Sequence, residues 1–300
     1  MNNLKHNKLT VFTPTFNRAH LLPRLYESLC MQTNKNFIWL IIDDGSRDNT
    51  EYLVKGWISK NLVDIQYHYK TNGGMHTAHN LAYSLIETEL NTCIDSDDYL
   101  PVNAVELIIE NWNNIIDKTN IAGIIGLDAD QQGSIIGSKI PNNLSRGTLS
   151  DLYLKHGVTG DKKIVIRTEI IKEFPKYPEY TGEKLVPLGA LYILIGKKFD
   201  FLYSNDILCI VEYQNEGSSK TIFRQYAQSP KGFAYARKIS INNEAGLINK
   251  FKNYTHLISS SLFAKDISVA FIGVNFFGSL IALPSGLLLY VYIVYKNKFS

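Results

Sequence analysis

The stretch NTCIDSDDYLP (Asn91–Pro101) places three carboxylates, Asp95, Asp97 and Asp98, within four residues, directly after an apolar run. Like charges this close to the end of a buried strand repel one another and compete for limited solvation. A divalent cation that also binds a substrate diphosphate would relieve the repulsion, because carboxylate oxygens are the hard ligands that Mg²⁺ or Mn²⁺ prefers. The cluster therefore predicts a cation site that serves a phosphate-bearing ligand.

Polar or turn-forming residues also follow three earlier apolar runs. They are Pro14 to Arg18 after the first run, Asp43 to Ser46 after the second, and Asn72 to Gly74 after the third. In open α/β sheets, ligands bind outside the carboxyl ends of the strands, so we expect all four segments at one sheet edge. Asp43 to Ser46 taken alone is more typical of an ordinary helix-capping turn.

The elements that would position these residues follow from the spacing of apolar side chains. Runs rich in β-branched or aromatic residues recur at 9–13, 37–42, 65–69 and 91–94, with helical spacing between them. This alternation predicts βαβ units and a mostly parallel sheet that helices cover on both faces. Further elements are expected as a helix over 101–117, strands over 121–129 and 163–167, a loop over 174–182, a helix over 183–196, two strands over 199–213, and helices over 231–261.

Composition narrows the class of protein. The chain has 300 residues, of which 45% are hydrophobic, and a formal net charge of +3, which is too small to indicate nucleic acid as a partner. Cys30, Cys93 and Cys209 are odd in number and far apart, as is typical of reduced thiols in a cytoplasmic protein. No apolar core of signal-peptide length begins the sequence, so we expect the bulk of the chain to stay inside the cell.

The C-terminal stretch differs from the rest of the chain. Residues 267–295 contain no charged side chain, and Lys296 and Lys298 follow them. Pro284-Ser285-Gly286 is expected to kink or break this stretch into two shorter pieces. The pattern favours a membrane-embedded or interfacial hairpin, with its basic end at cytoplasmic headgroups, over a helical pair packed on the protein's own core. Whether the stretch spans the membrane or lies on it stays open.

Four segments in order, VFTPTFNR, WLIIDDGSRDNT, NGGMHTAHNLAYSL and CIDSDDYL, closely resemble the nucleotide-sugar-binding half of family 2 glycosyltransferases over residues 8–110. The later stretches GDKKIVIRTEIIKEFPKYPEYTGEKLVPLGALY and EYQNEGSS resemble a subgroup found in bacterial surface-polysaccharide synthesis. The resemblance implies an α/β GT-A (Rossmann-like) fold. It also implies inverting transfer of a sugar from a nucleotide-diphosphate donor, expected to be UDP-linked, to a saccharide or lipid-linked saccharide acceptor.

The resemblance also implies a domain organisation. A GT-A domain would cover 1–215, with a nucleotide-sugar-binding half over 1–110 and an acceptor-side half over 111–215. A helical extension would follow over 216–265, and a hydrophobic membrane-associating segment over 266–300. The enzyme would then act in the cytoplasm, at the inner face of a bacterial cell membrane.

Carried over residue by residue, the resemblance implies a donor site. Asp44 would accept a hydrogen bond from the uracil ring N–H. Asp98 would bind the metal on the diphosphate, Asp97 the metal or the ribose, and Asp95 would complete the DxD pattern. The remaining residues expected at the nucleotide-sugar are Pro14, Thr15, Phe16, Asn17, Asn72, Gly73 and Gly74.

On the acceptor side, the resemblance implies that Glu183 is the general base, taking the proton from the acceptor hydroxyl as it attacks the sugar C1. The alternative for Glu183 is a structural acid at the N-terminus of the expected helix. Asp161 falls where the family often places a residue that contacts sugar or acceptor. The chain departs from the subgroup at Leu188, where a Glu is usual, and at Met75, where a Lys is common.

Several alternatives stay open. The spacing of IDSDD also fits a haloacid-dehalogenase-like phosphatase, and the Leu188 departure allows a membrane-associated protein that binds nucleotide-sugar without turnover. His76 and His79 share a helix face but lack a third ligand, so a metal pair is disfavoured. The loop tyrosines Tyr177 and Tyr180 could stack on an acceptor sugar or simply pack.

Overall fold

The computed structural model of the chain describes residues 8–212 and 221–299. The chain divides into two compact units. The first, here the sheet unit, comprises Met1–Asn72, Ala78–Pro175 and Lys198–Gln214, and the second, the helical unit, comprises Gly73–Thr77, Lys176–Lys197 and Asn215–Ser300. The expected domain boundary at 215/216 and nearly all of EYQNEGSS lie outside the described residues, as does the start of the chain.

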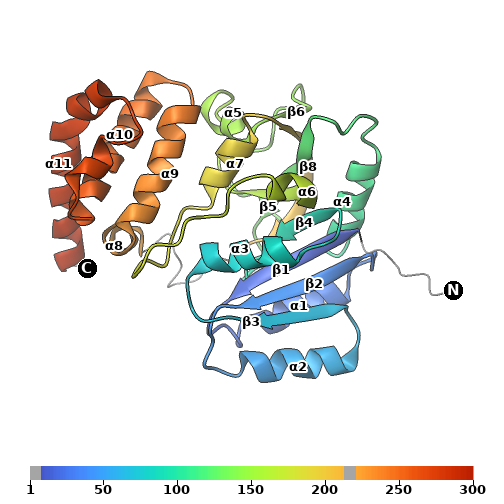
Figure 1. The fold of residues 1–300 in the computed structure, drawn as a ribbon. Coiled ribbons are helices and arrows are strands. Elements are labelled where there is room, and N and C mark those ends of the chain that lie inside the picture. Colours follow the sequence, from blue (N-terminus) through green and yellow to red (C-terminus); the bar gives the residue numbers. More distant parts are fainter. Residues whose placement is uncertain (1–7, 213–220, 300) are drawn as a thin grey trace. The chain divides into compact units, whose positions relative to one another are not determined.

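The sheet unit is built on one eight-stranded sheet with the order β3-β2-β1-β4-β7-β5-β8-β6 (Figure 1). Strands β1 to β4 pair in parallel, as do β5 and β8, whereas β7 and β6 run against their neighbours. This confirms the expected mostly parallel sheet. The strands are β1 (Leu9–Thr15), β2 (Phe37–Asp43), β3 (Ile65–Tyr69), β4 (Leu90–Cys93), β5 (Ile121–Ala129), β6 (Arg146–Gly147), β7 (Lys162–Arg167) and β8 (Asp200–Ile210).

Helices cover both faces of the first strands. α1 (Leu22–Cys30), α2 (Thr50–Lys60) and α4 (Ala104–Asn113) share one hydrophobic core with inward side chains such as Trp39 and Trp112. On the other face, the ring of Phe12 contacts His79 and Tyr83 of α3 (Met75–Leu85) edge to face. Two short helices, α5 (Leu149–Leu154) and α6 (Thr168–Lys172), complete the unit.

Three element predictions need correction. The helix expected over 101–117 is shorter, because asparagines at 113 and 114 favour its end. The helix expected over 183–196 is reduced to α7 (Gly189–Ile195), since Pro187 lacks an N–H and restricts the residue before it. The two strands expected over 199–213 are one strand, β8, because the polar triplet 204–206 is absorbed as a bulge between Tyr203 and Ile207 rather than forming a turn.

The helical unit contains α7, α8 (Ile222–Gln228), α9 (Pro230–Asn243), α10 (Leu247–Phe263), the 3₁₀ helix η2 (Ile267–Ala270) and α11 (Phe276–Phe299) (Figure 1). Helices α9 and α10 confirm the helical structure expected over 231–261. The core of this unit is made by side chains of α9, α10, η2 and α11, namely Ala234, Ile241, Tyr254, Leu257, Ile258, Ala270 and Ala282.

The expected break at Pro284 is wrong, because α11 continues through this residue as one helix. Neighbouring groups stabilise the helix there: the Ser285 hydroxyl donates to the Ala282 carbonyl at 2.8 Å and also lies 2.8 Å from the Thr255 hydroxyl of α10. Tertiary contacts of this kind let a helix tolerate an internal proline. The C-terminal stretch is therefore a long helix and not a hairpin of two short ones.

Candidate active site

The loops that follow β1 and β2 are tied together at the carboxyl edge of the sheet. The Asn17 N–H donates to the Ser46 hydroxyl at 2.8 Å, and the Arg47 N–H donates to the Asn17 side-chain oxygen at 2.8 Å. Asn17 has a φ of 54°, a left-handed conformation that asparagine tolerates better than most residues. The predicted convergence of these two strand ends is confirmed by these contacts.

Asp44 lies at this edge with only 4% of its surface exposed. One of its carboxylate oxygens accepts from the Lys70 ammonium at 2.5 Å, and the other accepts from the Asn72 side-chain amide at 3.1 Å. The Asn72 amide also donates to the Asp44 backbone carbonyl at 2.8 Å. Two predicted donor-site residues are thus brought together, and Lys70, which the sequence did not single out, supplies the counter-charge.

Pro14 and Thr15 end β1, and Phe16 follows them. Thr15 is buried, and its hydroxyl oxygen has no hydrogen-bond partner among the described residues, whereas the Phe16 ring is 45% exposed. An unpartnered buried hydroxyl beside an exposed aromatic ring suits a ligand that carries both polar groups and a flat ring. The geometry is therefore compatible with a base and ribose at this strand end.

The three acids after β4 occupy different surroundings. Asp97 is partly exposed, and one of its oxygens lies 3.3 Å from the Arg18 guanidinium. Asp98 is buried and accepts the Glu212 backbone N–H at 3.1 Å, beside a two-way backbone bridge between Tyr99 and Ile210. The acid cluster is thereby attached to the end of β8.

Burial dominates the protonation of this cluster. It raises the pKa of Asp98 to about 8, with the Asp95, Asp97 and Asp128 carboxyls adding to the effect and the Lys163 ammonium opposing it. Burial also raises the pKa of Asp95, again with Lys163 opposing. The pKa of a carboxyl rises this far only when nearby positive charge is too weak to offset desolvation and like charges.

Two members of the cluster were missed by the sequence analysis. Asp128 near the end of β5 is 3% exposed, and one of its carboxylate oxygens has no hydrogen-bond partner among the described residues. Lys163 reaches the same edge because β7 runs antiparallel, which puts its first residues beside the last ones of β5. Its ammonium donates to the Cys93 carbonyl at 3.4 Å.

Lys163 is the internal counter-charge of the acids. Burial alone would lower the pKa of its ammonium, but the Cys209 thiol and the carboxyls of Asp128, Asp98 and Asp95 together raise that pKa well above its ordinary value. The only sequence signals were a charged residue at the end of the apolar run IAGIIGLDA and the lysine pair that opens KKIVIR. Neither is informative until the direction of β7 is known.

We tested whether the cluster fits the expected divalent cation. No three His, Cys, Asp or Glu side chains are arranged as a ready metal site within residues 8–212 and 221–299. The donor chemistry does fit, because the cluster offers carboxylate oxygens, and the unpartnered oxygen of Asp128 and the raised pKa of Asp98 both indicate a deficit of positive charge. His76 and His79 are buried, and both ring nitrogens of His79 lie near other groups, Tyr83 and Cys93.

Gly74 and Glu183 belong to the helical unit. Gly74 has a φ of 96°, and a Cβ added there would lie 1.9 Å from the Lys184 carbonyl oxygen, so only glycine fits this close approach. Each carboxylate oxygen of Glu183 accepts one backbone N–H, from Lys231 at 3.0 Å and from Gly232 at 2.9 Å. Glu183 therefore caps the N-terminus of α9, and not that of α7 as the structural alternative supposed.

The remaining predicted residues are placed as follows. Asp161 is exposed in the sheet unit, and the neighbouring Lys162 turns its ammonium toward backbone carbonyls of the same loop, the nearest being that of Thr159 at 2.7 Å. Tyr177 is 3% exposed and donates its hydroxyl to the Leu188 carbonyl at 2.9 Å, so it packs and is not available for stacking. Tyr180 is half-buried.

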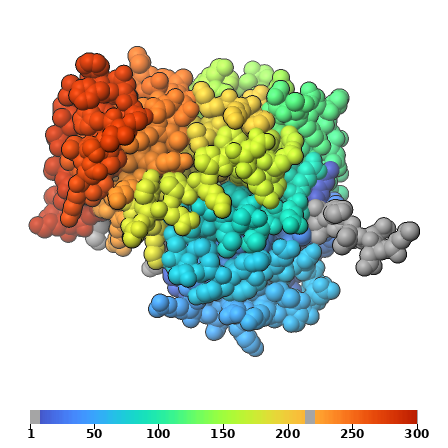
Figure 2. Space-filling model, viewed as in Figure 1, coloured from blue at the N-terminus to red at the C-terminus, as the bar shows by residue number. Residues whose placement is uncertain are grey.

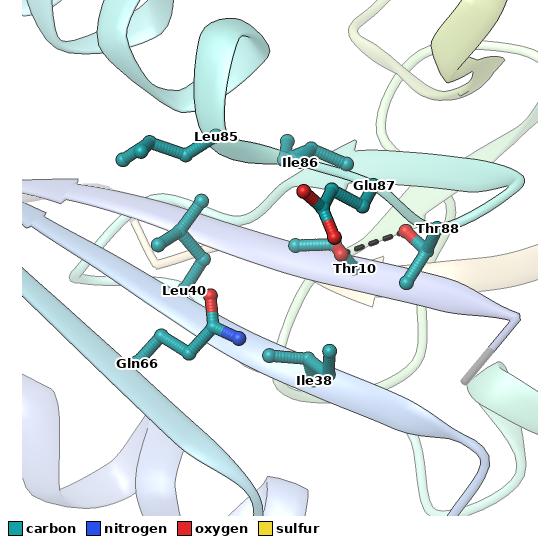
Figure 3. Close-up of a pocket in the computed structure, with 8 residues that line it drawn as sticks. All are labelled: Thr10, Ile38, Leu40, Gln66, Leu85, Ile86, Glu87 and Thr88. Carbon is teal, nitrogen blue, oxygen red and sulfur yellow. Dashed lines mark hydrogen bonds between the residues drawn. The ribbon is translucent and has the colours of Figure 1, made fainter. Parts of the chain in front are cut away.

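A cavity of about 220 Å³ lies elsewhere in the sheet unit, under the end of α3 (Figure 3). Its walls come from the first half of the strands, at Thr10, Ile38 and Gln66, and from the segment 85–88. Its two threonine hydroxyls bond each other at 2.7 Å, as the dashed line shows. Gln66 and Glu87 add polar groups to its lining, but the cavity lies away from the carboxyl edge, where ligands of open α/β sheets bind.

Known proteins resemble the chain in sequence and in fold. Chondroitin synthase of Pasteurella multocida is 32% identical over 111 residues, which are 37% of this chain and 11% of that relative. The crystal structure of S. aureus TarS 1-349 in complex with UDP-GlcNAc matches with a TM-score of 0.58 and 19% identity, covering 88% of this chain and 75% of that one. A mannosyltransferase from Pyrobaculum calidifontis, PcManGT, in complex with GDP-Man and Mn²⁺ matches with a TM-score of 0.55 and 16% identity, covering 97% and 83%.

The match to uncharacterized glycosyltransferases of Rickettsia covers 19 to 21% of the length of three of them. The solved structures share the fold, which is an α/β sheet with flanking helices of the GT-A type. A sequence model of glycosyl transferase family 2 matches residues 10–167, more than half of the chain, and that match sets aside the phosphatase alternative. The stretch includes β1 to β5, all four aspartates of the acid cluster, and Lys163. The chain belongs to glycosyl transferase family 2.

Proposed function

We propose that this glycosyltransferase moves a sugar, with inversion, from a UDP-linked donor to a saccharide or lipid-linked saccharide acceptor in cell-surface polysaccharide synthesis. The observation that carries the proposal is the cluster of Asp95, Asp97 and Asp98 at the same sheet edge as Asp44. The complexes of similar folds with UDP-GlcNAc and GDP-Man support a nucleotide-sugar donor. The similarity to chondroitin synthase supports a saccharide acceptor.

The donor would be held by residues of the sheet unit. Asp44 would accept the uracil N–H in addition to its bonds from Lys70 and Asn72, since each carboxylate oxygen can accept more than one hydrogen bond. Thr15 and Phe16 would contact the ribose and the base. The fixed position of Asp44 between a cation and an amide would orient the ring before the sugar is transferred.

The diphosphate would lie at the acid cluster. Asp98, Asp97 and Asp95 would hold Mg²⁺ or Mn²⁺, and such a cation stabilises the leaving nucleoside diphosphate. The Arg18 guanidinium, already 3.3 Å from Asp97, would orient that carboxylate. Lys163 would offset part of the repulsion among the acids when no donor is bound, whereas Asp128 adds to that repulsion.

A thermal-shift experiment tests the donor. UDP-GlcNAc, UDP and GDP-Man are each added with and without Mn²⁺, and we expect a UDP compound with Mn²⁺ to raise the melting temperature most, because ligand bound only to the folded state stabilises it. The Asp98→Asn variant should lose the Mn²⁺-dependent part of the shift. Asp200→Asn, at the opposite end of β8, is the matched control and should keep it. An equal shift in Asp98→Asn would contradict the metal assignment.

Glu183 is proposed as the general base, and its experiment must separate catalysis from folding. Removing a general base lowers the rate by roughly 10²- to 10⁴-fold. Glu183→Gln keeps an oxygen for one backbone N–H of α9 and should keep donor binding while losing transfer. Transfer that survives this change would place the base elsewhere. The two hydrogen bonds from the α9 N-terminus favour a second candidate, nucleotide-sugar binding without turnover, in which Glu183→Gln lowers only the melting temperature.

We also propose that the enzyme acts at the cytoplasmic face of the cell membrane, through its C-terminal helix. One helix among the described residues, α11, is long and apolar enough to cross a bilayer by length and composition. A lipid-linked acceptor would be concentrated at such a surface. Removal of residues 266–300 should therefore reduce transfer to a lipid-linked acceptor more than transfer to a soluble one.

A further inference from the structure

Helix α11 has bulky apolar side chains on its exposed side and mostly small residues at its packed side, the reverse of a helix in a water-soluble protein. The side that packs on the helical unit buries three small residues, Ser279, Ala282 and Gly286, and one bulky residue, Ile293. The opposite side carries bulky apolar side chains such as Ile281 and Leu288, which are 70% and 73% exposed. The full outward set is Phe276, Phe277, Leu280, Ile281, Pro284, Leu287, Leu288, Val291, Tyr292, Val294, Tyr295 and Phe299. We call this set the outward face.

The outward face is continuous. At about 100° per residue, its members fall within an arc roughly 160° wide, and no charged side chain interrupts them before Lys298. Soluble helices normally turn their apolar stripe to the core and their polar side chains to water. The reverse arrangement, with small residues at the helix contact and bulky ones outside, is typical of helices whose surroundings are lipid. In the space-filling view, α11 forms an outer edge of the helical unit (Figure 2).

Contacts attach α11 to the helical unit along most of its length. A Cβ at Gly278 would lie 2.5 Å from the Tyr254 ring, and one at Gly286 would lie 2.5 Å from Ile258. Further along, the Tyr290 ring lies 4.6 Å from that of Phe263. In these contacts the residue numbers increase together along both helices, so α10 and α11 run side by side in the same direction.

The last turns of α11 are attached as well. The Tyr292 ring lies 5.6 Å from the Phe223 ring of α8, and the Asn297 side-chain amide donates to the Phe223 carbonyl at 3.0 Å. The helix is therefore held from near its first turn to its last. A segment attached in this way cannot move into a bilayer without the helices that it contacts.

This attachment excludes a simple crossing. At 1.5 Å per residue, the 24 residues of α11 extend about 36 Å, enough to cross a hydrocarbon core of about 30 Å. A crossing α11 would, however, draw α9 and α10 into the hydrocarbon with it. Those helices carry Arg237, Lys238, Lys250 and Lys252. Charged side chains are expensive inside a bilayer. Only the outward face contacts lipid when the helix lies along the membrane surface.

We propose that the outward face of α11 docks lengthwise on an anionic lipid surface, with the helix axis parallel to the bilayer and its bulky side chains at the headgroup–acyl boundary. Lys296 and Lys298, the only charged residues of α11, would meet the anionic headgroups at its C-terminal end. The inference rests on the membrane association proposed above and adds the face and the orientation.

Vesicle co-sedimentation of the full chain tests the face. We expect binding to vesicles of 70% phosphatidylcholine and 30% phosphatidylglycerol, and weaker binding to pure phosphatidylcholine. The double variant Leu288→Glu/Val291→Glu should lose binding and keep the circular dichroism and melting temperature of the parent. Tyr52→Glu/Leu62→Glu, which changes two exposed apolar residues around α2, is the matched control and should bind like the parent.

A charge variant tests the basic end. Lys296→Gln/Lys298→Gln should weaken binding to the anionic vesicles by roughly 30-fold, at about 1 kcal/mol per lysine near the surface, and should leave binding to phosphatidylcholine unchanged. Undiminished binding of the Leu288→Glu/Val291→Glu variant overturns the proposal. So does light scattering that shows a dimer which the same variant separates, because the outward face would then cover a second copy of the chain.

Depth measurements test the orientation. Phe277→Trp, Leu288→Trp and Tyr295→Trp lie almost on one line of the outward face, about 27 Å from first to last. Quenching by lipids brominated at different acyl depths should place all three at the same shallow depth. A profile deepest at 288 would show a crossing helix and overturn the orientation. The parent chain, with its three tryptophans in the sheet unit, gives the background.

The experiments distinguish a failure of the lipid-docking proposal from a failure of the proposed activity. Vesicle binding is measured without donor or acceptor, and the donor-induced thermal shift is measured without lipid. A chain that binds UDP-sugar but no vesicles overturns the lipid face alone. A chain that binds vesicles through the outward face but no nucleotide-sugar overturns the proposed activity and leaves the docking surface standing.

Discussion

The sheet unit and the helical unit depart in opposite directions from the usual distribution of polar and apolar side chains. The sheet unit buries acids, with Asp98 and Asp128 only 7% and 3% exposed. The helical unit exposes bulky apolar residues, with Ile281 and Leu288 at least 70% exposed. A buried polar group and an exposed apolar surface are the two departures that carry functional information, because exposed single apolar residues are ordinary.

Each departure indicates which kind of binding partner would stabilise the unit. The acids of the sheet unit have Lys163 and Arg18 as counter-charges, yet the raised pKa of Asp98 indicates that more positive charge would be accommodated. The outward face of α11 exposes most of its bulky side chains, although the Tyr292 ring lies against that of Phe223 and the Phe276 ring against that of Phe271. Under the proposals above, the first unit would bind a cation with a diphosphate, and the second would dock on a lipid surface. The comparison shows that one chain can depart in two opposite ways from the rule that polar side chains are exposed and apolar ones buried, with one departure for each proposed partner.

The largest effect is expected from removing the counter-charge of the sheet unit. Lys163→Met removes a cation whose charge acts on Asp95, Asp98 and Asp128, and leaving buried carboxylates without it should cost roughly 3 kcal/mol of unfolding free energy. Urea unfolding of the full chain measures the change. Adding Asp128→Asn to this variant should recover part of the loss, because it removes one of the uncompensated charges.

Lys162→Met is the matched control for that prediction. The Lys162 ammonium donates to backbone carbonyls, at 2.7 Å from Thr159 and 3.2 Å from Gly160, and within the acid cluster its charge acts on Asp128 but not on Asp95 or Asp98. We expect a smaller cost of about 1 to 2 kcal/mol. Equal losses in the two variants would mean that Lys163 is not the counter-charge of the acid cluster.

Sequence alone could predict the sheet edge but not everything that reaches it. The strand ends with Asp44, Asn72 and Asp98 were predictable, because alternating strands and helices place the carboxyl ends of parallel strands together. Asp128 and Lys163 were not, since each lies inside a strand. Lys163 joins the acids only because β7 runs antiparallel, and strand direction is a property of the whole sheet.

The same reason explains the missed features of the helical unit. The local rule that proline interrupts a helix was correct in kind, but packing of Ser285 and Gly286 against α10 overrode it. The structural alternative to a catalytic Glu183 assigned it to the helix that follows it, whereas its hydrogen-bond partners lie at 231 and 232. Both errors concern contacts between residues distant in sequence, which periodicity and capping rules do not describe.

The second prediction is that enlarging a small packed residue of α11 costs more stability than truncating a bulky outward one. Gly286→Val should destabilise the chain by about 1 to 3 kcal/mol, because even a Cβ at this position lies 2.5 Å from Ile258. Leu288→Ala, two residues on and facing outward, should change the unfolding free energy in water by about 0.5 kcal/mol or less. Thermal unfolding of both variants measures the contrast. A larger loss for Leu288→Ala would mean that the outward face is buried within the protein.

The smallest expected effect is the change in stability with pH that comes from a partly buried titratable group of the helical unit, His256. His256 of α10 is partly buried beside Arg237 of α9 and Lys252 of α10, and its ring lies 5.5 Å from that of Tyr226 of α8. Burial and these two cations lower the pKa of His256 to about 4. The sheet unit instead holds buried acids whose pKa values burial raises, so the two units should respond differently to acid.

The direction of the pH effect follows from proton linkage. The pKa of His256 is about 4 in the folded chain and about 6.5 in the unfolded one, so the unfolded chain binds the proton first as the pH falls. The contribution of neutral His256 to stability is therefore complete above pH 6.5 and is lost between pH 6.5 and 4. We expect this loss to amount to about 1 to 2 kcal/mol for a partly exposed ring.

Urea unfolding of the parent chain and of His256→Gln at pH 7.5 and at pH 5 measures this contribution. The parent should lose more stability than the variant between the two pH values, because glutamine does not titrate. An equal loss in both would mean that His256 keeps its ordinary pKa and that the helical unit tolerates a charge there. In that case the response to acid would distinguish the two units only through the buried acids of the sheet unit.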